Sequence, residues 1–342
     1  MRRTLACFGV CGALQLAPSP VEAFALRGKR LFVKRDDKCC LRSGVSGNKA
    51  RKLASLDAAV PLARVIGSFG GSQSNAMAAL AVLAHAHGSR FVYFTKPVPR
   101  WLRAAPSGNL ARALSLGAEL VELAPSEYSA LFEDHGTLLP ACAPRPPATL
   151  LDEGALWVPQ GGAAPSAEEG VAALARELVE WWEDSPPSRA ESVDVVVPSG
   201  TGTTALFLAR HLAARAEMRV WAVPCVGDGA YLRAQMRALD LATGGDGAAL
   251  PRTLTSPSST KPPRFGALSR EALAVWSECG RADLPVDLLY APLAIRVVLE
   301  TLLSESGDAP REAERATLYL HTGGLEGLES QLDRYRRAGM LE

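Results

Sequence analysis

Two lysines at the start of an expected helix are the residues best placed for covalent chemistry. Lys49 and Lys52 lie three positions apart in the stretch Gly47–Lys52, so on a helix they share one face. Desolvation beside a second cation lowers the pKa of a lysine and frees its amine to form a Schiff base with a carbonyl. Positive charge at a helix start opposes the helix dipole, which favours anions there. The pattern indicates an anionic partner, while a solvated surface run remains the alternative.

A glycine- and threonine-containing loop follows the apolar strand expected at Val193–Val197. The loop Ser199–Thr204 opens a further helix, and successive N–H groups at such a turn form a cradle for an anion such as phosphate. The loop is neither a Walker A motif nor a GxGxxG dinucleotide motif. A tight helix cap without a ligand would give the same pattern.

Four polar residues stand at other expected turns. Ser74 ends the Gly/Ser-rich turn Gly67–Ser74, and Asn75 opens the helix that follows. The serine hydroxyl and the asparagine amide can therefore face a ligand. An ordinary helix N-cap is the alternative for this pair. Tyr290 places a phenol just before Pro292, and Thr322 follows a strand and precedes two glycines.

The elements that must position these residues alternate between strand and helix, which predicts a parallel α/β construction. The expected strands are Leu31–Lys34, Arg64–Gly67, Phe91–Thr95, Val193–Val197, Val220–Val223 and Thr317–His321. The segment Ser43–Leu53 begins as a glycine-containing loop and opens a helix that is expected to run through Leu62. The other expected helices are Asn75–His87, Asn109–Leu116, Ala167–Trp182, Ala205–Ala214, Arg270–Glu278 and Ala294–Ser304. Pro140–Pro147 is expected to cross between two lobes, and Thr243–Pro263 to form a loop.

Composition excludes several classes of protein. The 342 residues allow two domains, and a net charge of +1 gives no basic excess for nucleic acid or an anionic membrane. No apolar run approaches the roughly 20 residues that cross a bilayer. Seven scattered cysteines without CxxC, and five dispersed histidines, indicate a reducing, cytoplasmic location and no metal site. Arg2 and Arg3 before an apolar stretch resemble a short leader within residues 1–16.

Together these motifs resemble the pyridoxal-phosphate enzymes of the 1-aminocyclopropane-1-carboxylate deaminase/D-cysteine desulfhydrase family. The resemblance runs from about Pro18 to the C-terminal HTGG, and its most specific pieces are KRDD, SGNKARKL, GGSQSN and HTGG. It implies an α/β, two-lobed, fold type II structure of the tryptophan synthase β superfamily, each lobe an open, mainly parallel sheet flanked by helices. Residues 1–48 and 160–342 would form the larger lobe and 49–159 the smaller, in a homodimer.

The resemblance also implies a role for each site residue. Lys49 resembles the lysine that binds the cofactor covalently, and Lys52 the lysine near its phosphate. The phosphate loop would be formed by Thr201, Gly202, Thr203 and Thr204. Asn75 would bond the ring oxygen, and Ser74 would bind the substrate carboxylate or relay a proton. Tyr290 corresponds to an active-site tyrosine, and Thr322 is the remaining candidate to meet the pyridine nitrogen.

Several positions depart from the family pattern. Ala76 and Ala78 replace a Gln or His and an Arg, and Ala291 stands where relatives place Glu or Thr near the pyridine nitrogen. Leu293 lies where a lysine is usual, and Phe265 replaces a tyrosine. We expect a pyridoxal-phosphate-dependent lyase on a small amino acid, favouring D-cysteine-like β-elimination over cyclopropane ring opening. A protein that binds the cofactor without turnover is the alternative of another class.

Overall fold

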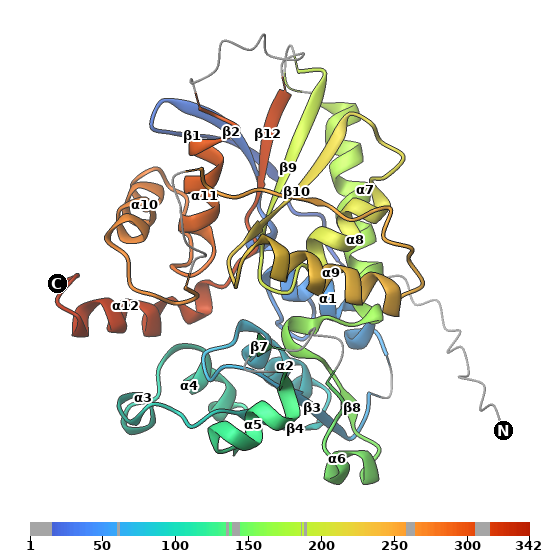
Figure 1. The fold of residues 1–342 in the computed structure, drawn as a ribbon, viewed down its shortest axis with the longest axis vertical. Helices are drawn as coiled ribbons and strands as arrows, with labels where there is room; N and C mark the ends of the chain where they lie inside the picture. Colours follow the sequence, from blue (N-terminus) through green and yellow to red (C-terminus); the bar gives the residue numbers. More distant parts are fainter. Residues whose placement is uncertain are drawn as a thin grey trace.

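The computed structural model describes residues 16–59, 62–134, 137–138, 144–185, 187, 190–257, 264–304 and 315–342. The segment considered as a leader and part of the expected Pro140–Pro147 crossing lie outside these residues. Two sheets with their helices make up the molecule, the larger in the upper half of Figure 1 and the smaller in the lower half. No helix of the described chain is long and apolar enough to span a membrane.

The larger sheet has six strands, parallel except for the hairpin at one edge. In spatial order they are β1 (Val21–Leu26), β2 (Lys29–Lys34), β12 (Arg315–Leu320), β9 (Ser192–Ser199), β10 (Met218–Pro224) and β11 (Arg252–Thr253). All eight residues of β9 are buried, as expected for a central parallel strand with both faces covered. Its apolar residues alternate between two cores, with Val195 in one and Val196 in the other.

Helices cover both faces of this sheet (Figure 1). One core contains residues of α7 (Glu168–Asp184), α8 (Thr203–His211) and α9 (Gly229–Ala242). The opposite core contains residues of α10 (Arg270–Arg281) and α11 (Ala291–Glu300). Burial on both faces leaves the carboxyl end of the parallel strands as the place where loops can form a site.

The smaller sheet has four parallel strands. Their order is β5 (Glu119–Glu122), β4 (Arg90–Thr95), β3 (Val65–Phe69) and β8 (Leu156–Trp157). Its helices are α2 (Asn75–Ala86), α3 (Arg100–Ala104), α4 (Gly108–Ser115), α5 (Pro125–Phe132) and α6 (Ala148–Asp152), and β6 (Glu133–Asp134) pairs with β7 (Thr137–Leu138) beside them. Phe69 and Phe132 stack with ring centroids 4.2 Å apart, which anchors α5 on the sheet.

Two further helices connect the parts that form the site. They are α1 (Gly47–Asp57) and the C-terminal α12 (Leu328–Arg337). Short 3-10 turns are η1 (Asp36–Lys38), η2 (Gln160–Gly162), η3 (Pro165–Ala167) and η4 (Leu325–Gly327). The expected lobe boundary at residues 48 and 49 falls within α1, and the one at 159 and 160 follows β8; the division into lobes stays a prediction.

The expected strands and most expected helices are found within a few residues of their predicted bounds, with two corrections. The helix expected to run through Leu62 ends at Asp57. The expected loop Thr243–Pro263 contains the two-residue strand β11, which adds to the edge of the larger sheet beside β10.

A buried ion-pair network joins α1 to the larger sheet. Arg51 and Asp36 are fully buried and pair at 2.8 Å, and Arg51 also donates to Glu177 of α7 at 2.8 Å. Lys34 Nζ of β2 lies 2.6 Å from Glu177 Oε2, the same oxygen that accepts from Arg51 Nη2. Burial alone would raise the pKa of Glu177, but hydrogen bonds from Arg51 and Lys34 hold it below its usual value. The network therefore depends on a charged carboxylate at position 177.

We predict that Glu177→Gln lowers the free energy of unfolding by about 3–5 kcal/mol, because it leaves Arg51 and Lys34 buried with too little negative charge. Urea denaturation at neutral pH measures this. The contribution of Glu177 is present above its ordinary pKa of 4.5 and is lost as the pH falls, because its folded-state pKa is lowered. Glu180→Gln, exposed on the same helix, is the control and should change stability by no more than about 0.5 kcal/mol. Equal effects of the two changes would contradict the prediction.

Candidate active site

A cavity of about 450 Å³ collects the loops at the carboxyl ends of strands from both sheets. The segments after β3, β9 and β12 line it, together with the first turns of α1 and the residue before α11. All ten residues expected to form the site line this cavity: Lys49, Lys52, Ser74, Asn75, Thr201, Gly202, Thr203, Thr204, Tyr290 and Thr322. None of the lining residues is an aspartate or a glutamate, so the cavity suits an anionic ligand.

The N-terminus of α8 forms an anion cradle at one part of the cavity. Gly202 caps this helix with φ +73°, and a Cβ there would lie 2.3 Å from Met236, so only glycine fits. The first N–H groups of a helix have no partner within it. Thr204 Oγ1 is buried and has no hydrogen-bond partner in the described structure. A buried unpaired hydroxyl beside free N–H groups fits the phosphate of a cofactor.

Lys52 lies where it can add a positive charge to this cradle. Its side chain is buried, and Nζ donates to the carbonyl of Gly161 at 3.0 Å. Gly161 in turn faces Thr201 of the cradle loop: a Cβ on this glycine would lie 3.0 Å from Thr201 Cγ2. Burial, and then the nearby charge of Lys49, lower the pKa of Lys52 well below its usual value. An anion bound at the cradle would restore its proton, so these residues fit the group that the sequence predicts.

Lys49 lies in the first turn of α1 and has the electrostatics of a reactive amine. Nζ donates to Asn48 Oδ1 at 3.1 Å. Burial lowers its pKa to about 8, and the negative charge of Glu326 opposes this lowering. The sequence predicted the direction of this shift and desolvation as its main cause, but the second cation, Lys52, is not among the causes for Lys49. The charge of Lys49 acts on Lys52 rather than the reverse.

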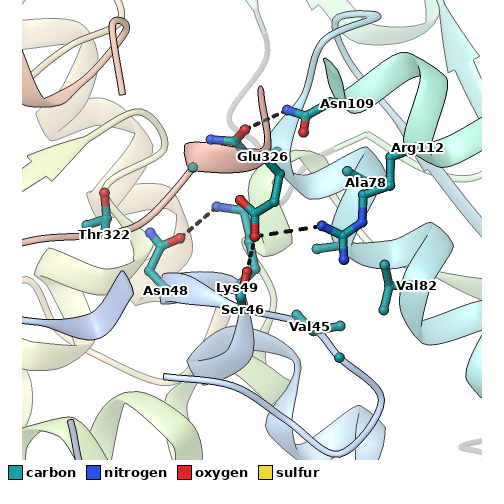
Figure 2. Close-up of a pocket in the computed structure, with 14 residues that line it drawn as sticks. Val45, Ser46, Asn48, Lys49, Ala78, Val82, Asn109, Arg112, Thr322 and Glu326 are labelled. Carbon is teal, nitrogen blue, oxygen red and sulfur yellow. Dashed lines mark hydrogen bonds and ion pairs between the residues drawn. The ribbon is translucent and has the colours of Figure 1, made fainter. Parts of the chain in front are cut away.

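Glu326 reaches Lys49 through a second, smaller cavity, shown in Figure 2. The cavity measures about 20 Å³, which is room for a single water. The Ser46 hydroxyl donates to Glu326 Oε1, and Arg112 Nη1 lies 3.9 Å from the same oxygen. These contacts hold the carboxylate beside the amine. Sequence reasoning missed Glu326, which comes from η4 and belongs to no motif near Lys49.

The Ser74–Asn75 turn serves both as a helix cap and as a wall of the cavity. Ser74 Oγ accepts from the N–H groups of Ala76 at 3.1 Å and Met77 at 3.4 Å, so the N-cap alternative also describes it correctly. Asn75 Oδ1 accepts from Asn109 of α4 at 2.6 Å. The serine hydroxyl also hydrogen-bonds the side chain of Tyr93, so its proton has a protein partner, which a ligand in the cavity would have to replace.

Tyr290 is held by the carboxylate that precedes it. Asp287 Oδ1 accepts from the N–H groups of Leu289 at 2.6 Å and of Tyr290 at 2.7 Å, which fixes the start of α11. The ring lies 5.5 Å from that of Phe265. Burial raises the pKa of Tyr290 above its usual value, so the phenol remains protonated at neutral pH. It is therefore a hydrogen-bond donor to the cavity.

A second residue that the sequence did not indicate is Arg334, on α12. Its guanidinium lines the same cavity as Lys49 and Tyr290. Nothing in the local pattern of α12 distinguishes it from the neighbouring Arg336 and Arg337, so only the fold identifies it as a site residue.

Comparison with known proteins agrees with this geometry. Residues 14–268 match the family model described as pyridoxal-phosphate dependent enzyme. A Thermotoga maritima protein whose name refers to 1-aminocyclopropane-1-carboxylate deaminase is 27% identical over 337 residues, covering 93% of this chain and 97% of that protein.

Two solved structures share the fold. The crystal structure of an ACC deaminase homologue gives a TM-score of 0.66 at 20% identity, covering 93% of this chain and 94% of that one. The structure of maize serine racemase gives a TM-score of 0.59 at 15% identity, covering 95% of this chain and 94% of that one. With more than half of its residues matched by one family model, the chain belongs to the pyridoxal-phosphate dependent enzymes and has their fold type II, tryptophan synthase β-like architecture.

Proposed function

We propose that this protein is a pyridoxal-phosphate-dependent lyase that acts on a small amino acid. The proposed reaction is a D-cysteine desulfhydrase-like β-elimination, which yields a 2-keto acid and ammonia. One observation carries the proposal: an amine with a pKa of about 8 and a phosphate cradle face the same carboxylate-free cavity. When bound, pyridoxal phosphate supplies an aldehyde for the lysine and an aromatic ring that withdraws electrons from the substrate's α-carbon.

The protein's residues divide the remaining work. The N-terminus of α8, Thr204 and Lys52 would hold the phosphate. Lys49 Nζ is the proposed base at the α-carbon, because a pKa of about 8 leaves part of it unprotonated at neutral pH. Ser74 would donate its hydroxyl proton to the substrate carboxylate. Tyr290, protonated in its buried site, would donate to the leaving group.

The ring of the cofactor would meet neutral residues of the protein. Asn75 is proposed to bond the ring oxygen, and Thr322 to face the pyridine nitrogen. Ala291 is buried and offers no carboxylate there. A hydroxyl partner makes the ring a weaker electron sink than a carboxylate would, and this favours elimination of a good leaving group over the opening of a cyclopropane ring.

Two other functions remain candidates, each on one observation. Ring opening of 1-aminocyclopropane-1-carboxylate is favoured by the name of the Thermotoga maritima relative. Binding of the cofactor without turnover is favoured by Ala76, Ala78 and Ala291, which stand where the family has functional side chains. The homodimer stays a prediction.

The first experiment separates these functions. Purified protein incubated with pyridoxal phosphate should show the absorbance band of the lysine-bound cofactor, and Lys49→Ala should abolish it while Lys96→Ala, an exposed lysine, should not. Keto-acid release is then measured with D- and L-cysteine, other small amino acids and 1-aminocyclopropane-1-carboxylate. Release from D-cysteine supports the proposal, release from the cyclopropane substrate alone supports ring opening, and a band without any release supports a binding protein. Absence of the band overturns all three.

A second prediction concerns the cradle. Thr204→Val should weaken cofactor affinity roughly tenfold, the value expected for a lost hydrogen bond to a charged group, and Lys52→Met should weaken it further. Fluorescence titration with pyridoxal phosphate measures both. Thr301→Val, whose hydroxyl donates to the Val297 carbonyl at the end of α11 and to no other described residue, is the control and should bind normally. Unchanged affinity in both site variants would remove them from the phosphate site.

A third prediction concerns the pH dependence set by Glu326. The unprotonated fraction of Lys49 rises through its pKa of about 8, so trapping of a small aldehyde at Lys49 by reductive amination of the apoprotein should accelerate over that range. Glu326→Gln removes the charge that raises this pKa, so the curve should shift to lower pH. Peptide mass spectrometry reports the modification at each pH. Glu329→Gln, exposed on α12, should leave the curve in place; a shift to higher pH in Glu326→Gln would refute the assignment.

A further inference from the structure

Arg334 is a cation in the active-site cavity that the proposed reaction does not use. Its only hydrogen-bond partner among the described residues is the carbonyl of Gly266, which accepts from Nη2 at 2.6 Å. No described carboxylate pairs with it, and none lines the cavity. The cavity therefore contains a guanidinium whose remaining N–H groups have no acceptor among the described residues.

Contacts of α12 fix where this guanidinium lies. Ser330 Oγ donates to Gln73 Oε1 at 3.0 Å, next to the Ser74 turn. Gln331 Oε1 accepts from the N–H of Leu288 at 2.7 Å, in the segment that leads to Tyr290. Arg334 follows Ser330 by four residues and so lies on the same face of the helix. The helix is thereby held against both proposed substrate-binding segments, and Arg334 projects between them.

In the proposed complex, each anionic group already has a partner other than Arg334. The cofactor phosphate has the N-terminus of α8 and Lys52, and the substrate carboxylate has the hydroxyl of Ser74. Lys49 has to lose its proton to react. A half-buried cation without a counterion is unfavourable, and an arginine fork is suited to binding a carboxylate or a similar anion.

The space beside Arg334 also favours an anion. A neighbouring cavity of about 170 Å³ shares Phe265, Gly266 and Leu289 with the main one. Arg264, Arg296 and Glu271 line it, and Arg296 Nε also lies 3.9 Å from Glu300 Oε1. An anionic substrate side chain that extends past Phe265 would meet the guanidinium groups of Arg264 and Arg296.

We infer that Arg334 binds a negatively charged group at the end of the substrate's side chain, so that the preferred substrates are amino acids with an anionic side chain. This inference rests on the proposed function and narrows its small amino acid to one with an anionic side chain. D-cysteine, whose thiol is mostly protonated at neutral pH, then reports the elimination chemistry and is not the preferred substrate. The anion can be a side-chain carboxylate or an anionic leaving group, because the guanidinium recognises the shared charge and geometry. Arg334 would then set specificity without taking part in proton transfer.

The test compares pairs of equal shape and different charge. Aspartate and asparagine, each as D and L enantiomer, are titrated into the cofactor-loaded protein, and binding is measured by calorimetry. Wild type should bind aspartate of the preferred enantiomer roughly tenfold more tightly than the matching asparagine, as expected for a charge-assisted hydrogen bond. Arg334→Met should bring the ratio close to one, and Arg334→Lys should retain part of it. Arg336→Met, on the same helix but paired with Asp333 outside the cavity, should keep the full ratio.

The ratio separates recognition from structural damage. If Arg334 only supports the structure through Gly266, or if it binds the α-carboxylate, Arg334→Met should weaken the binding of aspartate and asparagine equally. The ratio of their affinities would then persist in Arg334→Met, and this result overturns the inference. A wild-type ratio near one overturns it without any variant. Absence of the cofactor band would overturn the proposed function and this inference with it, whereas a normal band with no preference for aspartate overturns this inference alone.

Discussion

The position of the reactive amine depends on one backbone contact, between the start of α1 and the chain that leaves β12. The N–H of Asn48 donates to the carbonyl of Thr322 at 3.0 Å. A Cβ on Gly47 would lie 2.7 Å from that carbonyl oxygen, and one on Gly323 would lie 3.0 Å from Gly47 Cα. Both glycines also have positive φ, so no other residue fits at either position without strain. This contact fixes Asn48 against the backbone of Thr322, and with it the position of the adjacent Lys49.

The same C-terminal segment reaches the smaller sheet. A Cβ on Gly324 would lie 2.7 Å from Asn75 Nδ2, and one on Gly327 would lie 2.8 Å from Asn109 Nδ2. Glu326 and Arg334 follow in η4 and α12, which continue past the cavity. The chain therefore leaves its last strand, in the larger sheet, and then packs against helices of the smaller sheet at the edge of the cavity. The glycines of HTGG permit this close packing, and so they are a structural requirement of the site as well as a family motif.

Local patterns predicted much of this site, because each of its main parts is a short segment with its own signature. The Val-rich strand before Gly202 and the turn before Ser74 both place polar residues at the carboxyl ends of parallel strands, where loops of different strands converge. Glu326 and Arg334 could not be predicted in this way. Each acts on residues far away in the sequence, and neither differs from the surface charges around it in sequence. Desolvation of the lysines was predicted, but which lysine also receives the charge effect of the other was not, since this depends on how the two side chains pack.

Helix α1 has structural ion pairs on one side and the reactive lysines on the other. Arg51 points into the buried network with Asp36 and Glu177, whereas Lys49 and Lys52 face the cavity. Because Arg51 lies between the two lysines in sequence, its fixed position sets the rotation of the helix and with it the direction of both amines. A burial that lowers the pKa of Lys49 is useful only if the amine cannot rotate towards solvent. The ion pairs of Arg51, outside the cavity, thus help to maintain the desolvation on which the chemistry of Lys49 depends.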